Sequence, residues 1–207
     1  MLEIYHSLAQ GGIVMIPLAI CSILALAIII EKFIVYKNNK IFNPEIISVV
    51  NNISSPDDFP LAISVCKNYH GPFSHLIKII LDNFHQPLED IKEDVADQAR
   101  QEIRLLERGL GILETVAAIA PILGLLGTVL GMVRVFADIS TQGVGDPALL
   151  SAGISEALIS TAVGLSIGIP TLVFYNYFYQ RANSVILELE KISNELIRKI
   201  RSFKQES

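Results

Sequence analysis

A carboxylate stands at the start of a long uncharged stretch of the chain. Glu156 is followed by residues 157–180, none of which carries a formal charge, before Arg181. This stretch exceeds the roughly 20 apolar residues that a helix needs to cross a bilayer. Ionisable groups within membrane segments are costly and often mark ion or proton pathways. Glu156 is therefore a candidate proton-path group, with Ser160 one turn on as a hydrogen-bond donor, or an interfacial glutamate near headgroups.

Two apolar stretches carry small residues at helical spacing. Small residues at steps of three and four let transmembrane helices approach closely. A threonine on such a face can bond its own helix, bond a neighbouring helix or line a wet pathway, and the spacing leaves these roles open. The two sets are Ala117, Pro121, Gly124, Thr128 and Gly131 in one stretch and Ala157, Thr161, Gly164 and Gly168 in the other.

Other reactive side chains form no catalytic or metal-binding pattern. Cys21 and Cys66 belong to no CxxC motif, and we expect both to be unpaired. The histidines, His6, His70, His75 and His85, are irregularly spaced, and we interpret them as solvent or packing residues. Arg134 and Asp138 lie one turn apart and are candidates to pair with each other. We expect no enzymatic activity, no bound metal or cofactor and no nucleic-acid partner.

Three uncharged runs must position these residues. Hydrophobic types make up 51% of the 207 residues, and the mean hydropathy is +0.49. A soluble domain of this length is usually more polar. We predict transmembrane helices over 12–36, 112–139 and 150–179, each close to the length needed for a span.

The basic residues predict the topology of these spans. Of the 16 Lys and Arg residues, none lies in the first ten positions or in the 140–150 connection. The positive-inside rule then gives a periplasmic 1–11 segment, a cytoplasmic 37–111 region, a periplasmic 140–149 loop and a cytoplasmic 180–207 helix. The positive charges follow the first apolar run, which is the reverse of a cleaved signal peptide. Lys32 is expected to snorkel at the inner boundary.

Two apolar stripes extend the second and third spans. Positions at steps of three and four predict a long amphipathic helix from Pro87 that runs unbroken into span two, and a second one after span three. Pro44, Pro56 and Pro72 are candidate helix starts, and Glu195 and Lys199 form an i,i+4 pair. The predicted fold is an all-α integral membrane protein with spans two and three extended into a cytoplasmic helical bundle. The stripes are Leu88, Ile91, Val95, Ala99, Ile103, Leu106, Leu110 and Leu113, and Val185, Leu189, Ile192, Leu196, Ile200 and Phe203.

The membrane motifs resemble a known family. "APILGLLGTVLGM", residues 120–132, is followed by "GDPALLSAGISEALISTAVGLSIGIPTLVFYNYF", residues 145–178. This combination is similar to the signature of the MotA/TolQ/ExbB proton-channel family, and most of all to ExbB-type and then TolQ-type members. The three-span layout extends the resemblance over nearly the whole chain.

The resemblance implies a function. Family members are homopentamers in the Gram-negative inner membrane, and spans two and three line a pore around a single-span partner of ExbD or TolR type. The partner's aspartate takes up and releases protons, and the assembly drives TonB-dependent import or the Tol-Pal system. Thr128, Thr161 and Glu156 match pore-lining and proton-path positions. Gly124, Gly131, Ser160, Gly164 and Gly168 are candidates for pore lining or helix packing, and Pro170 and Asn176 match positions of structural role.

The chain departs from some members of the family. Span one starts within about a dozen residues, so we expect no long outside extension before it, and three spans argue against a flagellar motor. Two other classes of function stay open. One is a non-conducting scaffold that orients its partners, and the other is a self-contained transporter that uses Glu156 alone. The sequence does not separate the TonB branch from the Tol branch.

Overall fold

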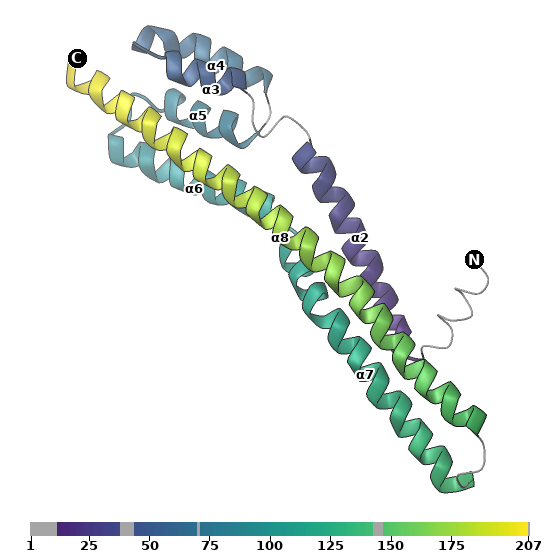
Figure 1. Cartoon of the computed structure of the whole chain (residues 1–207). Coiled ribbons are helices and arrows are strands. Elements are labelled where there is room, and N and C mark those ends of the chain that lie inside the picture. The colour runs from purple at the N-terminus through teal and green to yellow at the C-terminus, as the bar shows by residue number, and fades with distance from the viewer. Residues whose placement is uncertain (1–11, 38–43, 70, 143–146, 207) are drawn as a thin grey trace. The chain divides into compact units, whose positions relative to one another are not determined.

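Helices and short connections make up the described part of the structure (Figure 1). The computed structural model describes residues 12–37, 44–69, 71–142 and 147–206, and no strand occurs among them. The segment before residue 12 and residues 143–146 of the predicted loop lie outside the described residues. The helices are α2 (Met15–Lys37), α3 (Pro44–Asn52), η1 (Pro56–Asp58), α4 (Phe59–Asn68), α5 (Pro72–Asp82), α6 (Leu88–Glu107), α7 (Leu110–Gln142) and α8 (Pro147–Glu206).

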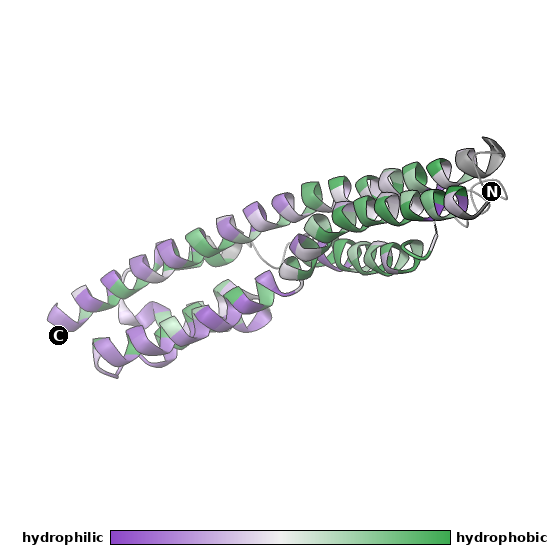
Figure 2. Ribbon diagram, turned by 90° about the horizontal axis from the view of Figure 1, so that it is seen from below, coloured by the Kyte–Doolittle hydropathy of each residue, from purple (hydrophilic) through white to green (hydrophobic). Residues whose placement is uncertain are grey.

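Three of these helices contain apolar windows long enough to cross a membrane. Within the described residues they are α2, the helical stretch that ends in α7, and α8. Figure 2 shows α2, α7 and the first part of α8 mostly in green, and the remainder of α8 with purple turns among the green. The predicted all-α membrane fold is confirmed. The predicted helix starts at Pro44, Pro56 and Pro72 are also confirmed.

The chain divides into two compact units, to both of which α2 and α8 contribute. Residues 1–31 and 109–178 form the first, which we call the apolar unit. Residues 32–108 and 179–207 form the second, which we call the amphipathic unit. The apolar unit holds the uncharged windows, and the amphipathic unit holds the shorter helices α3, α4, α5 and α6.

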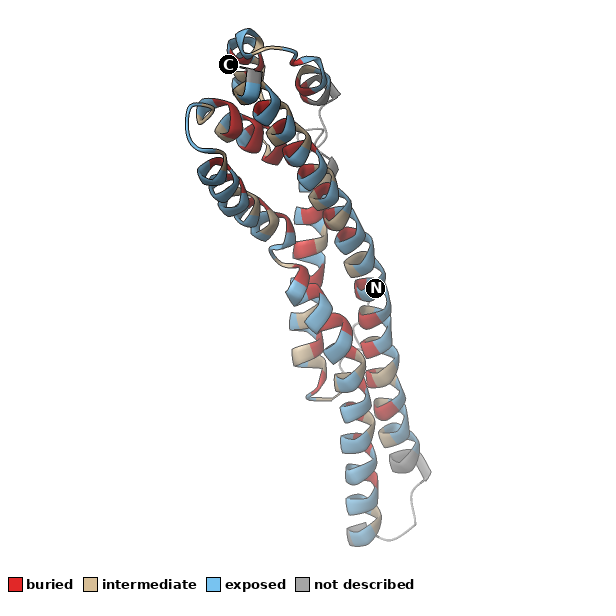
Figure 3. Cartoon of the chain, turned by 90° about the vertical axis from the view of Figure 1, so that its left-hand side faces the viewer, coloured by how far each residue is buried: buried red, intermediate tan, exposed pale blue. Residues whose placement is uncertain are grey.

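The amphipathic unit has a core of large aliphatic and aromatic side chains. Helix α5 packs against α6 and α4, and Ile80, Ile91, Leu196 and Ile200 are completely buried. In Figure 3 the helix that ends at the C-terminus carries buried positions along one side. The predicted stripe on α8 therefore faces this core from Val185 onward. Removal of so much apolar surface from water is the main stabilising contribution to this unit.

Lysines stabilise the ends of helices in the amphipathic unit. The expectation that Lys32 snorkels is wrong, because its side chain is 1% exposed and its Nζ donates to the carbonyl oxygen of Leu106 at 2.7 Å. The Tyr36 hydroxyl donates to the same oxygen at 3.1 Å. Helix α6 ends one residue later, so this carbonyl has no partner within the helix. A cation here also interacts favourably with the helix dipole.

Lys199 plays the same part at the end of α3. Its Nζ donates to the carbonyl oxygens of Val50, Asn51 and Ile53 at 2.9, 2.8 and 3.1 Å. The sequence predicted an i,i+4 pair with Glu195, but the described contacts of Lys199 are to backbone carbonyls. The carbonyls at the end of α3 offer several acceptors at once, and lysine side chains commonly hydrogen-bond the last carbonyls of a helix.

The predicted unbroken helix into span two is interrupted. Helix α6 ends at Glu107, and α7 begins at Leu110. Gly109 between them has φ +83°, a left-handed conformation that glycine adopts without steric cost. A Cβ at this position would lie 3.3 Å from Cγ2 of Ile28, so the site is also narrow. Gly109 therefore gives a helix stop that periodicity does not reveal, because the apolar stripe continues across it.

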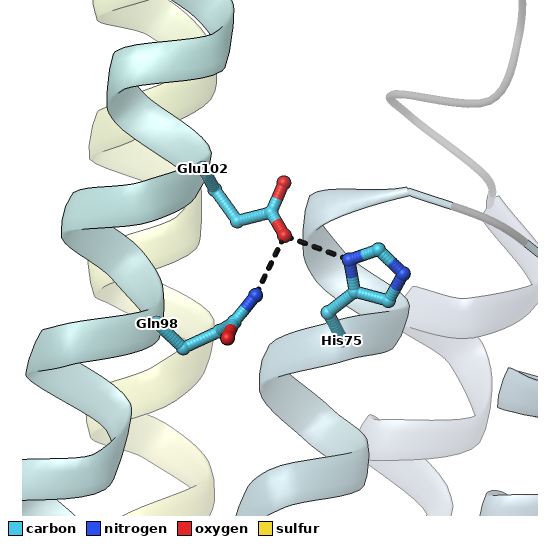
Figure 4. A network of polar contacts seen from close by, with 3 residues as sticks. All are labelled: His75, Gln98 and Glu102. Atoms are coloured by element: carbon cyan, nitrogen blue, oxygen red, sulfur yellow. Dashed lines mark hydrogen bonds and ion pairs between the residues drawn. The ribbon is translucent and has the colours of Figure 1, made fainter.

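A polar network joins α5 to α6 (Figure 4). The Glu102 side chain is 8% exposed, and its Oε1 lies 2.7 Å from Nδ1 of His75 and 2.8 Å from Nε2 of Gln98. These contacts satisfy a carboxylate that would otherwise be buried without partners. His75 is thus a half-exposed packing histidine, as the sequence suggested. Among the described residues no group of three or more His, Cys, Asp or Glu side chains could hold a metal ion.

Candidate functional site in the α7 and α8 pair

Helices α7 and α8 touch through their backbones in the apolar unit. A Cβ added to Gly164 would lie 2.6 Å from the carbonyl oxygen of Ala120 and 2.9 Å from Cα of Gly124. A Cβ on Gly124 would lie 2.9 Å from the carbonyl oxygen of Ser160. Only glycine permits this approach at either position. The two small faces found in the sequence are therefore in contact with each other within one chain.

The remaining glycines extend this contact along both helices. A Cβ on Gly131 would lie 3.1 Å from Cβ of Ala157, and one on Gly168 would lie 2.6 Å from Cγ of Pro121. Both glycines are buried. The sequence left pore lining and helix packing open for these residues, and the structure places them in the packing of α7 on α8. Gly127, which the sequence analysis missed, belongs to the same contact because a Cβ there would collide with Ser160.

Two hydroxyl groups of α8 lie within hydrogen-bond distance of the carbonyl oxygen of Gly124. Thr161, half-buried, donates to it from Oγ1 at 3.1 Å. Ser160, completely buried, donates from Oγ to the carbonyl oxygen of Ala157 at 2.8 Å and approaches that of Gly124 at 3.3 Å. These bonds add polar contacts to a packing interface that is otherwise apolar.

Thr128 is also half-buried and bonds within its own helix. Its Oγ1 donates to the carbonyl oxygen of Leu125 at 2.6 Å. A hydroxyl has one hydrogen to donate and two lone pairs to accept with. With that hydrogen directed to a carbonyl, Thr128 and Thr161 both present an acceptor. Such an oxygen can bind water or the proton of a neutral acid.

Glu156 forms an ion pair across the two helices. Its Oε1 lies 2.8 Å from Nη1 of Arg134, and the side chains of Glu156 and Arg134 are 23% and 56% exposed. The sequence suggested Asp138 as the partner of Arg134 and Ser160 as a donor to Glu156. The structure places the guanidinium against Glu156 and directs Ser160 to backbone carbonyls.

Two residues near Glu156 carried little signal in the sequence. Arg134 stands out only as the one basic residue within the predicted 112–139 span. Gly12 precedes α2 with φ +71°, and a side chain there would collide with the Glu156 carboxylate.

Pro170 lies inside α8 at an exposed position, and Asn176 is exposed as well, so the structure does not bring these two into the α7 and α8 contact.

Comparison with known proteins places this helix pair in a family. The sequence model of the MotA/TolQ/ExbB proton channel family matches residues 70–191 of this chain. This range contains Thr128, Glu156 and Thr161. Several proteins named as biopolymer transport proteins also match the chain.

Three such relatives show the extent of the similarity. An ExbB homologue of Methanothermobacter thermautotrophicus is 30% identical over 96% of this chain and 68% of its own length. An ExbB-like protein of Synechocystis is 32% identical over 86% of this chain and 87% of its own length. The ExbB protein of Salmonella typhimurium is 34% identical over 53% of this chain and 46% of its own length. Because the family match covers more than half of its length, the chain belongs to the MotA/TolQ/ExbB proton channel family.

Proposed function

We propose that this chain is an ExbB/TolQ-like inner-membrane subunit of a motor driven by the proton-motive force. Five copies form a pore around an ExbD/TolR-like single-span partner and, with a TonB-like protein, power import across the outer membrane. The observation that carries the proposal is the pair of half-buried threonines on adjacent membrane helices. Relatives named ExbB, such as that of Salmonella typhimurium, and the resemblance to ExbB-type members favour the TonB branch over a TolQ-like role in the Tol-Pal system.

The threonine geometry suits a proton carrier supplied by the partner. Thr161 and Thr128 each direct their hydroxyl hydrogen to a backbone carbonyl. Their oxygens can then accept a hydrogen bond from a protonated aspartic acid or from water. To donate to the ionised aspartate, Thr161 must first leave the Gly124 carbonyl. The arrangement therefore favours the neutral acid at this level of the path, where a bare carboxylate is costly.

The proposed orientation follows the charge pattern. The periplasmic side carries the N-terminus and the connection between α7 and α8, and the cytoplasmic side carries the amphipathic unit and the C-terminus. Glu156 then lies near the periplasmic end of α8. Membrane transport, rather than enzymatic chemistry, is the activity of the family.

A scaffold role without proton flux is the second candidate. The glycine faces of α7 and α8 are filled by each other, so the small residues serve the packing of one chain. This use requires no proton path and would suit a ring that only houses and orients its partners. A transporter that uses Glu156 alone is disfavoured because its carboxylate is already paired with Arg134.

Proton flux in liposomes separates these functions. The chain is reconstituted alone, with its single-span partner, and with a partner whose intramembrane aspartate is changed to asparagine, under an imposed membrane potential. We expect flux only with the unmodified partner. No flux from a complex that is intact by size and composition would contradict the proposal and favour the scaffold. Flux from this chain alone would favour the self-contained transporter.

A further inference from the structure

Three separate segments of the apolar unit converge on one carboxylate. Arg134 reaches it from α7 at 2.8 Å, and Glu156 itself belongs to α8. The backbone of Gly12, before the start of α2, lies so close that a side chain there would collide with Oε1. The left-handed φ of +71° at Gly12 independently disfavours any other residue type.

The charges of this pair depend on each other. A guanidinium is charged at every accessible pH, so it cannot avoid the cost of a buried charge by losing its proton. A carboxylate and a guanidinium in hydrogen-bond contact offset much of each other's cost in a membrane segment. Removal of either partner leaves the other unpaired, which is unfavourable where water is scarce. The Glu156 side chain is the more buried of the two and therefore depends more on the contact.

We propose that Arg134 is a positioning residue for Glu156, and that the pair rather than the glutamate alone is the functional unit. Arg134 fixes the carboxylate on α8 beside Gly12 and α7. Glu156 thereby acts as a stationary anion at the mouth of the proton path and is not the group that carries the proton through it. This inference rests on the proposed function, because it assigns a role within that path.

The neighbouring polar groups Ser160 and Asp138 do not orient the Glu156 carboxylate as Arg134 does. Ser160, one turn further along α8, directs its hydroxyl to the carbonyls of Ala157 and Gly124. Asp138, one turn further along α7, carries the same sign of charge as Glu156 and cannot attract it. The guanidinium of Arg134 is thus the cation on the adjacent helix that can orient the carboxylate.

A set of variants in the complex with the single-span partner tests the proposal. Arg134→Gln and Glu156→Gln are each expected to lower partner-dependent proton flux at least tenfold. Arg134→Lys keeps the charge but loses the planar geometry, so an intermediate flux is expected. Asp138→Asn, at the neighbouring turn, is the matched control and should retain nearly full flux.

The charge-swapped double variant Arg134→Glu with Glu156→Arg separates positioning from simple helix bonding. We expect the swap to recover most of the thermal stability that either single reversal loses, because the ion pair is restored. Flux should stay at least tenfold low, because the carboxylate now lies on α7. Full recovery of flux in the swap, or wild-type flux in Arg134→Gln, would overturn the proposal.

The stability measurements keep the inference separate from the proposed function. If the wild-type complex carries no flux, the proposed function fails on that result alone. A double-mutant cycle on the melting temperature, with Arg134→Gln, Glu156→Gln and the double variant, then tests the pair itself. Non-additive losses uphold the ion pair, and additive losses overturn it.

Discussion

The two units of this protein hold their helices together in opposite ways. In the apolar unit, α7 and α8 meet at glycines, and the backbone of one helix touches that of the other. In the amphipathic unit, α5, α6 and the end of α8 meet through large side chains such as Ile80, Ile91 and Leu196. The same long helix, α8, takes part in both kinds of packing.

The difference follows from the solvent. In water, burial of a large apolar side chain is favourable, so a core of leucine and isoleucine drives association. In lipid, a leucine gains little by leaving hydrocarbon, and helices associate through close packing and hydrogen bonds. The polar contacts differ accordingly. The apolar unit directs hydroxyls of Ser160 and Thr161 to a helix carbonyl, whereas the amphipathic unit places Lys32 and Lys199 on helix ends.

The largest expected effect comes from filling the glycine contact. Gly164→Leu puts a side chain where Cβ alone would lie 2.6 Å from a backbone oxygen, so α7 and α8 must separate. We expect a loss of about 3 kcal/mol or more, enough to prevent recovery of folded protein. Gly111→Leu is the control, since a Cβ there meets nothing within 4 Å. Equal yield and melting temperature for both variants, in detergent, would show that the backbones do not touch.

Removal of a large side chain should instead damage the amphipathic unit. Leu196 is completely buried, and Leu196→Ala is expected to cost about 3 kcal/mol through lost burial and a cavity. Leu187→Ala, at a position 66% exposed on the same helix, should cost far less. Urea unfolding followed by circular dichroism compares the two. Similar midpoints would mean that this part of α8 does not face a core.

The buried lysine should matter more than an exposed one. Lys32→Met retains the apolar stem but removes the donor to the Leu106 carbonyl, and we expect a loss of about 2 kcal/mol. Lys67→Met, at an exposed position in α4, is the matched control and should stay within about 0.5 kcal/mol of wild type. Thermal unfolding in detergent provides the measurement. A Lys32→Met variant as stable as the control would restore the snorkelling interpretation.

The smallest effect is a pH dependence that arises from Cys66. Burial raises the pKa of this thiol from 9.0 to about 11, so the folded state keeps its proton where the unfolded state loses it. Stability should therefore fall as the pH rises from about 9 to about 11. By linkage the loss amounts to about 1 kcal/mol at pH 10. Cys66→Ala removes this contribution, and the difference in unfolding free energy between the two proteins at pH 8 and pH 10 isolates it. An unchanged difference would mean that the thiol is accessible to water.

Periodicity predicted the elements of the fold but not their partners. The stripe from Val185 onward correctly gave the buried face of α8, because a step of three or four residues follows from helix geometry alone. The stripe from Leu88 to Leu113 did not reveal the helix break at Gly109, because the apolar pattern continues across it. A pattern says which face is apolar and says nothing about a single backbone torsion.

The candidate site was predictable in part for the same reason. The small faces and both threonines are visible in the sequence, but their mutual contact is not, because it depends on the register of α7 against α8. The pairs of Arg134 with Glu156 and of Lys32 with Leu106 join residues 22 and 74 positions apart. Local rules favoured near neighbours such as Asp138 for Arg134, since sequence reasoning can weigh only partners within a turn or two.

The most direct test of a proton path shared with the partner is the flux of the intact complex with Thr161→Val. Thr171→Val is the matched control, because Thr171 lies on the same helix and bonds the carbonyl of Ile167 within it. We expect at least a tenfold loss of partner-dependent flux for Thr161→Val and flux near wild type for Thr171→Val. Equal flux in the two variants, from complexes of equal composition, would contradict a path that passes Thr161.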